Sequence, residues 1–375
     1  MAELNKLLAN EERLVVSLTY AEASATHVVL NQVHDQLLSV SNGLGHDINE
    51  VGREMKSLKM HVQNDRQETL EQRQLDHLKS VLHSKAVSYT DEWYSILKGN
   101  MLRGSAAWLQ DESLFQYWID HQAPVLWVFG GPGAGKSMLA CWLITHLVSQ
   151  YNSTSDLSGE TNVGYFFVKE NREELRTPSS IFRTLAWQLQ EHDEAFRKHA
   201  VVACKSSSSI ARVQDLWENL FLKFFQGDLP SAQGHRTILV IDGLDEADSS
   251  ARQDVLRLMK EYVKRVRRGY PHRVQFAVFG RGTLRSDLTS VEFDHEDKII
   301  EVSEKNKDDL REYIKYRLSG LNVIRTMRAN TRAGGLKKAK AFGSEIGKLV
   351  LEGADGVFLW VLWSRALGLF RLTDT

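Results

Sequence analysis

The feature that most constrains this chain is the stretch VFGGPGAGKS at residues 128–137. It contains the pattern G-x-x-x-x-G-K-S, which runs from Gly130 to Gly135, Lys136 and Ser137. A short apolar run precedes the pattern, and the helix-like segment MLACWLITHLV follows it. A strand, a glycine-rich loop and a helix in this order predict a phosphate-binding loop, or P-loop. The residues expected to bind the phosphates are Gly130, Gly131, Pro132, Gly133, Ala134, Gly135, Lys136 and Ser137.

The residue types in this loop suit a nucleotide bound with Mg²⁺. Small residues let consecutive backbone N–H groups curl around phosphate oxygens, and the N-terminus of the next helix adds a positive dipole. Lys136 places a point charge near the β- and γ-phosphates, and the Ser137 hydroxyl is a suitable ligand for Mg²⁺. The alternative is a glycine turn without a ligand. That alternative does not explain why every fixed position of the P-loop pattern is present, nor why a strand precedes the loop and a helix follows it.

A second motif supplies the carboxylate that such chemistry needs. In TILVIDGLDEAD, residues 237–248, Asp242 stands at the end of an apolar run, where it is expected to orient Mg²⁺. Asp245 and Glu246 follow and are candidates for positioning or deprotonating a water. Taken alone, these acids fit equally well at the start of a helix, where they complement the dipole. Together with the upstream loop, they favour a catalytic interpretation.

A third candidate is Arg281, which follows the apolar run VQFAVF at residues 274–279. Its guanidinium could sense a γ-phosphate through charge-assisted hydrogen bonds. An ordinary surface arginine in a loop is the alternative.

Short apolar runs alternate with helical patterns from residue 124 onward. Runs of this kind suit strands buried on both faces of a parallel sheet. The extra run at 163–168, between the two motifs, is typical of ATPases with an additional strand. We therefore predict an α/β fold, a P-loop NTPase core with a parallel five-stranded sheet, preceded by an α-helical region and followed by a helical subdomain. The expected strands are 125–129, 163–168, 237–241, 274–279 and 298–302, the helices include 181–189 and 216–224, and the domains are 1–99, 100–303 and 304–375.

The N-terminal region carries a coiled-coil-like pattern. Between Val33 and Val62, apolar residues recur at steps of three and four, with one additional four-residue step at Ile48. This heptad seam predicts either a helix packed within its own chain or a helix that pairs with a partner, including a second copy of the chain.

The tetrapeptide NKDD at residues 306–309 matches the guanine-reading pattern N-K-x-D. However, it opens the amphipathic segment NKDDLREYIKYRL and does not close a strand onto a base. We interpret Asn306 as a helix cap that is followed by acids in the first turn. ATP or ADP is therefore the expected nucleotide, with GTP kept as an alternative.

Composition bears on the remaining partners. The formal net charge is −1, and no aromatic platform accompanies the basic stretches 264–273 and 313–344, so nucleic acid is an unlikely partner. The two cysteines, Cys141 and Cys204, fit a reducing compartment and exclude a cysteine-ligated zinc site. The apolar run 356–370 contains an arginine and is too short to span a bilayer. We expect a cytoplasmic protein without a membrane partner.

Together these segments resemble the NACHT branch of STAND NTPases, and most of all the nephrocystin-type modules of fungal NOD-like receptors. The matching blocks extend over roughly residues 100–365; besides the two motifs they include RGSAAWLQDESLFQYWI, VGYFFVKENREELRTPSSIFRTLAWQL, FGRGTLR, KNKDDLREYIKYRL and ADGVFLWVLW. The resemblance implies a signalling ATPase in which ADP holds a closed state and ATP an open, assembling one. It assigns phosphate and Mg²⁺ binding to Lys136, Ser137 and Asp242, water to Asp245 and Glu246, and sensing to Arg281.

Two departures from this family stand out. No proline follows Pro271, so the G-x-P motif of the helical domain is missing, and no winged-helix domain or repeat period is visible. We therefore expect a fragment or a truncated relative.

The leading hypothesis is a nucleotide-dependent switch with weak Mg²⁺-dependent hydrolysis. A non-catalytic scaffold that acts through its N-terminal helices and a P-loop kinase are the alternatives.

Overall fold

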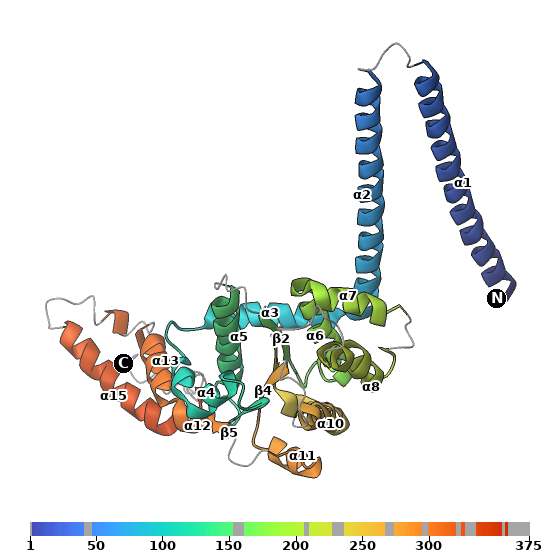
Figure 1. Cartoon of the computed structure of the whole chain (residues 1–375). Helices are drawn as coiled ribbons and strands as arrows, with labels where there is room; N and C mark the ends of the chain where they lie inside the picture. Colours follow the sequence, from blue (N-terminus) through green and yellow to red (C-terminus); the bar gives the residue numbers. More distant parts are fainter. Residues whose placement is uncertain are drawn as a thin grey trace. The chain divides into compact units, whose positions relative to one another are not determined.

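The computed structural model of the chain divides into two compact units, Met1–Gln74 and Leu75–Thr375 (Figure 1). Each unit is described by itself. The described residues are 2–40, 47–152, 161–205, 210–226, 236–266, 274–294, 299–319, 324–326, 335–354 and 357–358.

The N-terminal unit consists of helix α1 (Ala2–Val40) and most of helix α2 (Asp47–Leu82). The heptad seam is therefore shared between two helices, and its central part at 41–46 lies outside the described residues. Apolar seam residues are exposed on both helices, with Val33 at 44% and Leu58 at 58%. Val33 and Leu58 are therefore not part of a buried core, whereas the side chains at positions 37, 40, 44, 48 and 51 of the seam lie outside the described residues.

The larger unit is built on a sheet of five parallel strands, as predicted, and their order is β2-β3-β4-β1-β5. The run at 163–168 was expected to be the additional strand, and this is wrong: β4 lies between the P-loop strand β1 and the strand β3 that ends in Asp242, whereas β2 lies outside β3. Order along the chain does not determine the order of parallel strands in a sheet, because each pair is joined by a crossover. Every residue of β1 and β4 is buried, which is why their sequences are apolar apart from Gln275. The strands are β1 (Val125–Phe129), β2 (Thr161–Phe167), β3 (Arg236–Asp242), β4 (Val274–Gly280) and β5 (Ile299–Glu301).

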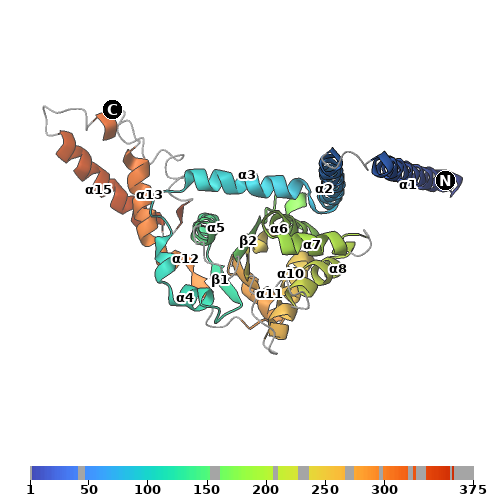
Figure 2. The same cartoon turned by 45° about the horizontal axis from the view of Figure 1, so that its top comes forward.

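Side chains alternate between two hydrophobic clusters, one on each face of the sheet. On β1, Trp127 and Phe129 belong to the cluster under α6, α10 and α11, and Leu126 and Val128 belong to the cluster under α3, α4 and α5. Figure 2 shows α3 running beside α5 and α6, and these elements are in contact. The covering elements are α3 (Lys85–Asn100), η1 (Ala107–Asp111), α4 (Ser113–Ile119), α5 (Lys136–Asn152), η2 (Glu173–Leu175), α6 (Pro178–His192), α7 (Glu194–Ala203), η6 (Leu244–Glu246), α10 (Ser249–Val266) and α11 (Leu284–Ser290).

Two predicted helices are present, one of them with an unexpected turn. Helix α6 begins after Thr177, whose hydroxyl accepts a hydrogen bond from the Ser180 N–H, and it buries the predicted apolar positions. The segment predicted over 216–224 is helical but changes type. It starts as α8 (Val213–Leu216), continues as the π-helical turn η4 (Trp217–Leu222) and ends as α9 (Lys223–Phe225).

The C-terminal part is helical, as predicted. Helix α12 (Val302–Lys305) follows β5 directly, and α13 (Lys307–Ser319) packs on α15 (Gly335–Ala354) through a small apolar cluster that includes Ile314 and Val350. Among the described residues, no helix is both long enough and apolar enough to cross a membrane.

Candidate nucleotide-binding site

The P-loop joins β1 to α5 at the carboxyl edge of the sheet. Gly133 and Gly135 have φ values of 74° and 94°, in the left-handed region that favours glycine. A Cβ on Gly135 would also lie 3.1 Å from the ring of Phe358. Both glycines are therefore required by the shape of the loop.

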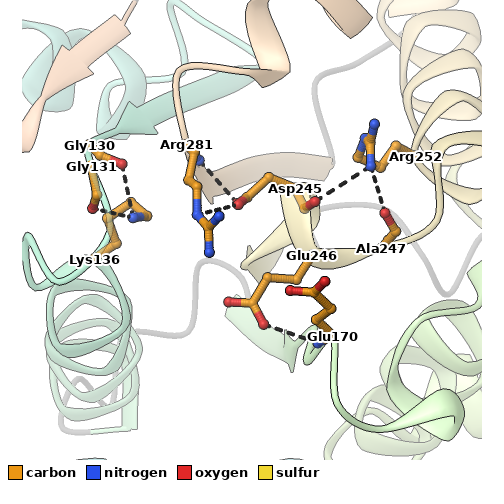
Figure 3. A network of polar contacts seen from close by, with 9 residues as sticks. All are labelled: Gly130, Gly131, Lys136, Glu170, Asp245, Glu246, Ala247, Arg252 and Arg281. Atoms are coloured by element: carbon orange, nitrogen blue, oxygen red, sulfur yellow. Dashed lines mark hydrogen bonds and ion pairs between the residues drawn. The ribbon is translucent and has the colours of Figure 1, made fainter.

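Lys136 occupies the space inside its own loop. Its Nζ donates hydrogen bonds to the carbonyl oxygens of Gly130 and Gly131, each at 2.9 Å (Figure 3). Burial lowers the pKa of this ammonium, and the nearby carboxylates of Asp242 and Asp245 partly oppose that shift. The ammonium thus stands at the P-loop, available to exchange two carbonyl partners for phosphate oxygens.

Asp242 is a buried carboxylate at the end of β3, with 1% of its surface exposed. Neither of its oxygens has a hydrogen-bond partner among the described residues. Burial raises the pKa of this carboxyl to about 6, against the opposing effects of Lys169, the Ser137 side chain and Lys136. A buried carboxylate without a partner is costly unless a cation completes it.

This donor set fits Mg²⁺. A hydroxyl and one carboxylate, completed by phosphate oxygens and waters, are the ligands that Mg²⁺ prefers in nucleotide sites. The described residues contain no group of three or more His, Cys, Asp or Glu that could hold a metal without such a ligand. Ser137 and Asp242 would therefore hold the ion together with the nucleotide.

Asp245 and Glu246, the two acids after Asp242, have different partners in the structure. They lie on the turn η6, which begins after Gly243 at a φ of 75°. Asp245 accepts a hydrogen bond from the Arg281 backbone N–H at 3.0 Å and forms an ion pair with the Arg281 Nε at 3.1 Å (Figure 3). Asp245 and Arg281, predicted as a water-positioning acid and a phosphate sensor, are thus paired with each other.

Glu246 points in another direction, towards the loop after β2. One of its carboxylate oxygens accepts a hydrogen bond from the Glu170 backbone N–H at 3.1 Å (Figure 3). No other hydrogen bond to the Glu246 carboxylate is seen within the described part of the chain, so its second oxygen can act on a water. The structure therefore favours Glu246 over Asp245 as the residue that acts on water.

Arg252 of α10 is a supporting residue that the sequence analysis missed. It donates to the Ala247 carbonyl at 2.7 Å (Figure 3), which fixes the end of η6. Its Nε also donates to Asp287 at 2.8 Å. It lies within an ordinary amphipathic helix, and no local pattern distinguishes it there.

Two further contacts to the P-loop come from far along the chain. The side-chain amide of Asn306 donates to the Ala134 carbonyl at 2.8 Å, and the Phe358 N–H donates to the Gly133 carbonyl at 2.8 Å. Asn306 does precede α13, as the cap prediction required, but its amide is directed to the loop.

The strand order, with the P-loop after β1 and Asp242 after β3, defines a P-loop NTPase of the additional-strand class. Residues 104–281 match the family model described as Nephrocystin 3, N-terminal. This match confirms that the chain resembles a NACHT-like P-loop NTPase, as its sequence indicated.

The similar proteins are distant. The vegetative incompatibility protein HET-E-1 of Podospora anserina is 26% identical over 151 residues, which is 40% of this chain and 10% of that protein. Among solved structures, Cdc6p from Pyrobaculum aerophilum has a TM-score of 0.37 at 13% identity, covering 57% of this chain and 49% of its own. The ORC1 protein of Aeropyrum pernix, solved in complex with DNA, has a TM-score of 0.38 at 15% identity, and the match covers 71% of this chain and 66% of the ORC1 chain. At these scores we base no inference on the two structures.

Proposed function

We propose that this chain binds ATP and ADP with Mg²⁺ and hydrolyses ATP slowly, as a nucleotide-dependent switch. The observation that carries the proposal is the juxtaposition of the Lys136 ammonium, which is held by two loop carbonyls, with the buried and unpartnered carboxylate of Asp242. Both groups lack a strong partner of opposite charge, and phosphates with Mg²⁺ would supply one to each. The test is calorimetric titration of the whole chain with Mg-ADP, Mg-ATP and Mg-GTP.

Each residue has a separate task in this proposal. Lys136 and the loop N–H groups bind the β- and γ-phosphates, and Ser137 and Asp242 hold the metal side of the nucleotide. When bound, Mg²⁺ would neutralise charge on the phosphate oxygens. Glu246 orients a water and accepts its proton through the oxygen that Glu170 does not occupy.

Slow turnover is expected from the position of Arg281. An arginine that reaches the transferring phosphate can contribute about 10³–10⁵ in rate. Here the Arg281 guanidinium is paired with Asp245, which is itself only 6% exposed. The site therefore holds its nucleotide for a long time unless this pair opens, and slow turnover suits a switch better than a kinase or a motor.

The Asp245–Glu246 pair provides a direct test of this division of roles. We expect Glu246→Gln to lower ATP turnover by about 10²–10⁴-fold, because the amide cannot accept the proton from water. Nucleotide affinity should change less than about twofold. The matched variant Asp245→Asn, which mainly weakens the pair with Arg281, should lower turnover by less than about tenfold. Single-turnover measurements with bound ATP distinguish the two, and equal losses would contradict the assignment of Glu246.

ATP is the preferred nucleotide in this proposal. The amide of Asn306 already donates to the P-loop carbonyl of Ala134, and Asn306 is buried. A guanine-reading asparagine must have its amide free for the base. The N-K-x-D match at 306–309 therefore gives GTP no support, and competition between ATP and GTP in the calorimeter decides the point.

The proposed output is self-association through the N-terminal helices. Their exposed apolar residues recur at coiled-coil spacing and are surrounded by both signs of charge, which suits a helix that pairs with a second copy. The named relative acts in vegetative incompatibility, according to its name, and a signalling role for this chain is consistent with that.

A charge introduced on the seam should prevent association. Leu58 and Val62 are exposed at 58% and 47%, so Leu58→Asp with Val62→Asp should leave the fold of each copy intact. We expect light scattering to show larger particles for the wild type with a non-hydrolysable ATP analogue than with ADP, and monomers for the variant in both. The exposed substitution Lys59→Asp is the control for added negative charge. A wild type that stays monomeric at high concentration in both nucleotides would exclude this output.

A further inference from the structure

The region after β5 donates hydrogen bonds to the carbonyl oxygens of two consecutive P-loop residues, Gly133 and Ala134. The Asn306 amide donates to the Ala134 carbonyl over a separation of 172 residues, and the Phe358 N–H donates to the Gly133 carbonyl. The Phe358 ring also packs on Gly135, where a Cβ would lie 3.1 Å and 3.3 Å from two ring carbons.

The same region is attached to the core at a second point. Asp309 accepts hydrogen bonds from the Ala106 N–H at 2.8 Å and from the Trp108 indole N–H at 3.0 Å. Tyr313 of α13 meets Phe358 edge-to-face, with ring centroids 5.4 Å apart. The start of α13 is therefore hydrogen-bonded to the segment before β1 through Asp309, and it packs on Phe358 through Tyr313. Asn306, directly before α13, is hydrogen-bonded to the P-loop.

We propose that Asn306 and Phe358 are positioning residues for the P-loop, which couple occupancy of the phosphate site to the seating of α13 on the NTPase core. This inference rests on the nucleotide binding proposed above. In this proposal the N-K-x-D tetrapeptide attaches α13 to the core, because its first and last residues, Asn306 and Asp309, form hydrogen bonds with Ala134 and Ala106.

The physical link is the rigidity of the peptide group. A trans peptide is planar, and its C=O and N–H point in opposite directions. Holding the Ala134 carbonyl therefore fixes the direction of the Gly135 N–H, and holding the Gly133 carbonyl fixes that of the Ala134 N–H. In a P-loop these N–H groups form the cradle for the phosphates. Any shift of α13 would turn the same peptide units and change the cradle.

The coupling must act in both directions. If the seated helix helps the loop to bind a nucleotide, the bound nucleotide stabilises the seated helix by the same factor. A buried Ala134 carbonyl that loses its donor also carries an unsatisfied hydrogen bond. Both effects should be measurable when the Asn306 amide is removed.

The test compares Asn306→Ala and Phe358→Ala with Lys307→Ala, a control at an exposed position at the start of α13. Without nucleotide, we expect amide hydrogen exchange in residues 131–139 and 307–319 to be at least about threefold faster in the first two variants, while β3 and β4 exchange as in the wild type. With N-methylanthraniloyl-ADP and Mg²⁺ as the probe, we expect affinity to fall by about tenfold in Asn306→Ala. In the wild type, this probe should slow exchange across α13, and the variants should lose that protection.

Each outcome is decisive for the inference. Rates and affinities equal to those of Lys307→Ala would overturn it, and so would faster exchange throughout β3 and β4, because Asn306 would then only stabilise the fold. A wild type that binds no nucleotide would refute the proposed function, whereas the measurement without nucleotide still tests whether Asn306 and Phe358 hold the loop. Retained protection of α13 in both variants would exclude the coupling even if the loop itself loosened.

Discussion

The variant Lys136→Ala should lose most of its affinity for Mg-ADP and Mg-ATP. A charge-assisted hydrogen bond to phosphate contributes about 1.5–3 kcal/mol, which corresponds to roughly 10- to 150-fold in the dissociation constant. The ammonium is already at the P-loop, where it is bonded to the Gly130 and Gly131 carbonyls, so binding requires only an exchange of partners. Alanine would leave these carbonyls and the phosphates without that donor.

Calorimetric titration measures this loss directly. The control is Lys198→Ala, which removes an equal charge from a lysine that forms an exposed ion pair with Glu194. Thermal unfolding without nucleotide should show that Lys136→Ala still folds. An affinity equal to that of the control would mean that the loop does not bind phosphate through this residue.

The variant Asp242→Asn should stabilise the nucleotide-free protein at neutral pH and abolish Mg²⁺-dependent turnover. The pKa of Asp242 is raised in the folded state to about 6 from its usual 3.8. The folded state thus holds this proton more tightly than the unfolded state does, so stability is lost as pH rises through this range and the full cost is present above it. A shift of this size corresponds to about 3 kcal/mol, which is the upper limit of the gain expected from asparagine.

The pH dependence separates this explanation from a general packing effect. Denaturant unfolding should show the gain of Asp242→Asn at pH 7.5, and the difference from the wild type should disappear only near pH 3, below both the folded pKa of about 6 and the usual pKa of 3.8, where the carboxyl is protonated in both states. Asp308→Asn, at an exposed position, is the control for the change in charge. A gain that is equal at both pH values would show that the buried charge is not its cause.

The sheet could be predicted from the sequence because its signal is local. Strands buried on both faces require continuous apolar runs, and the observed strands fall within two residues of the predicted ranges where the structure describes both. The P-loop and the Asp242 motif were equally readable, since each joins a strand end to a turn of defined chemistry. The grouping of Lys136, Ser137 and Asp242 then follows from parallel strands whose carboxyl ends share one edge.

The remaining features of the site depend on contacts between distant segments. Asn306 looked like a helix cap because a tetrapeptide reveals only its own helix, whereas its amide finds the Ala134 carbonyl across the fold. The pairing of Asp245 with Arg281 depends on β3 and β4 being neighbours in the sheet, which no single motif encodes. The heptad spacing likewise does not indicate where one helix ends. It therefore could not predict that the seam is shared between α1 and α2.

The short strand β5 has a practical consequence for anyone who expresses this domain. It covers the outer edge of β1 by pairing with Trp127, Val128 and Phe129, and Val302 directly after it lies against Gly130. A recombinant fragment trimmed to the family match, residues 104–281, would omit β5 and expose a bare, fully apolar edge on the strand that carries the P-loop. Such an edge is a template for intermolecular strand pairing and precipitation. The segment that is recognisable by homology is therefore shorter than the segment that must be produced, which extends at least to Phe358.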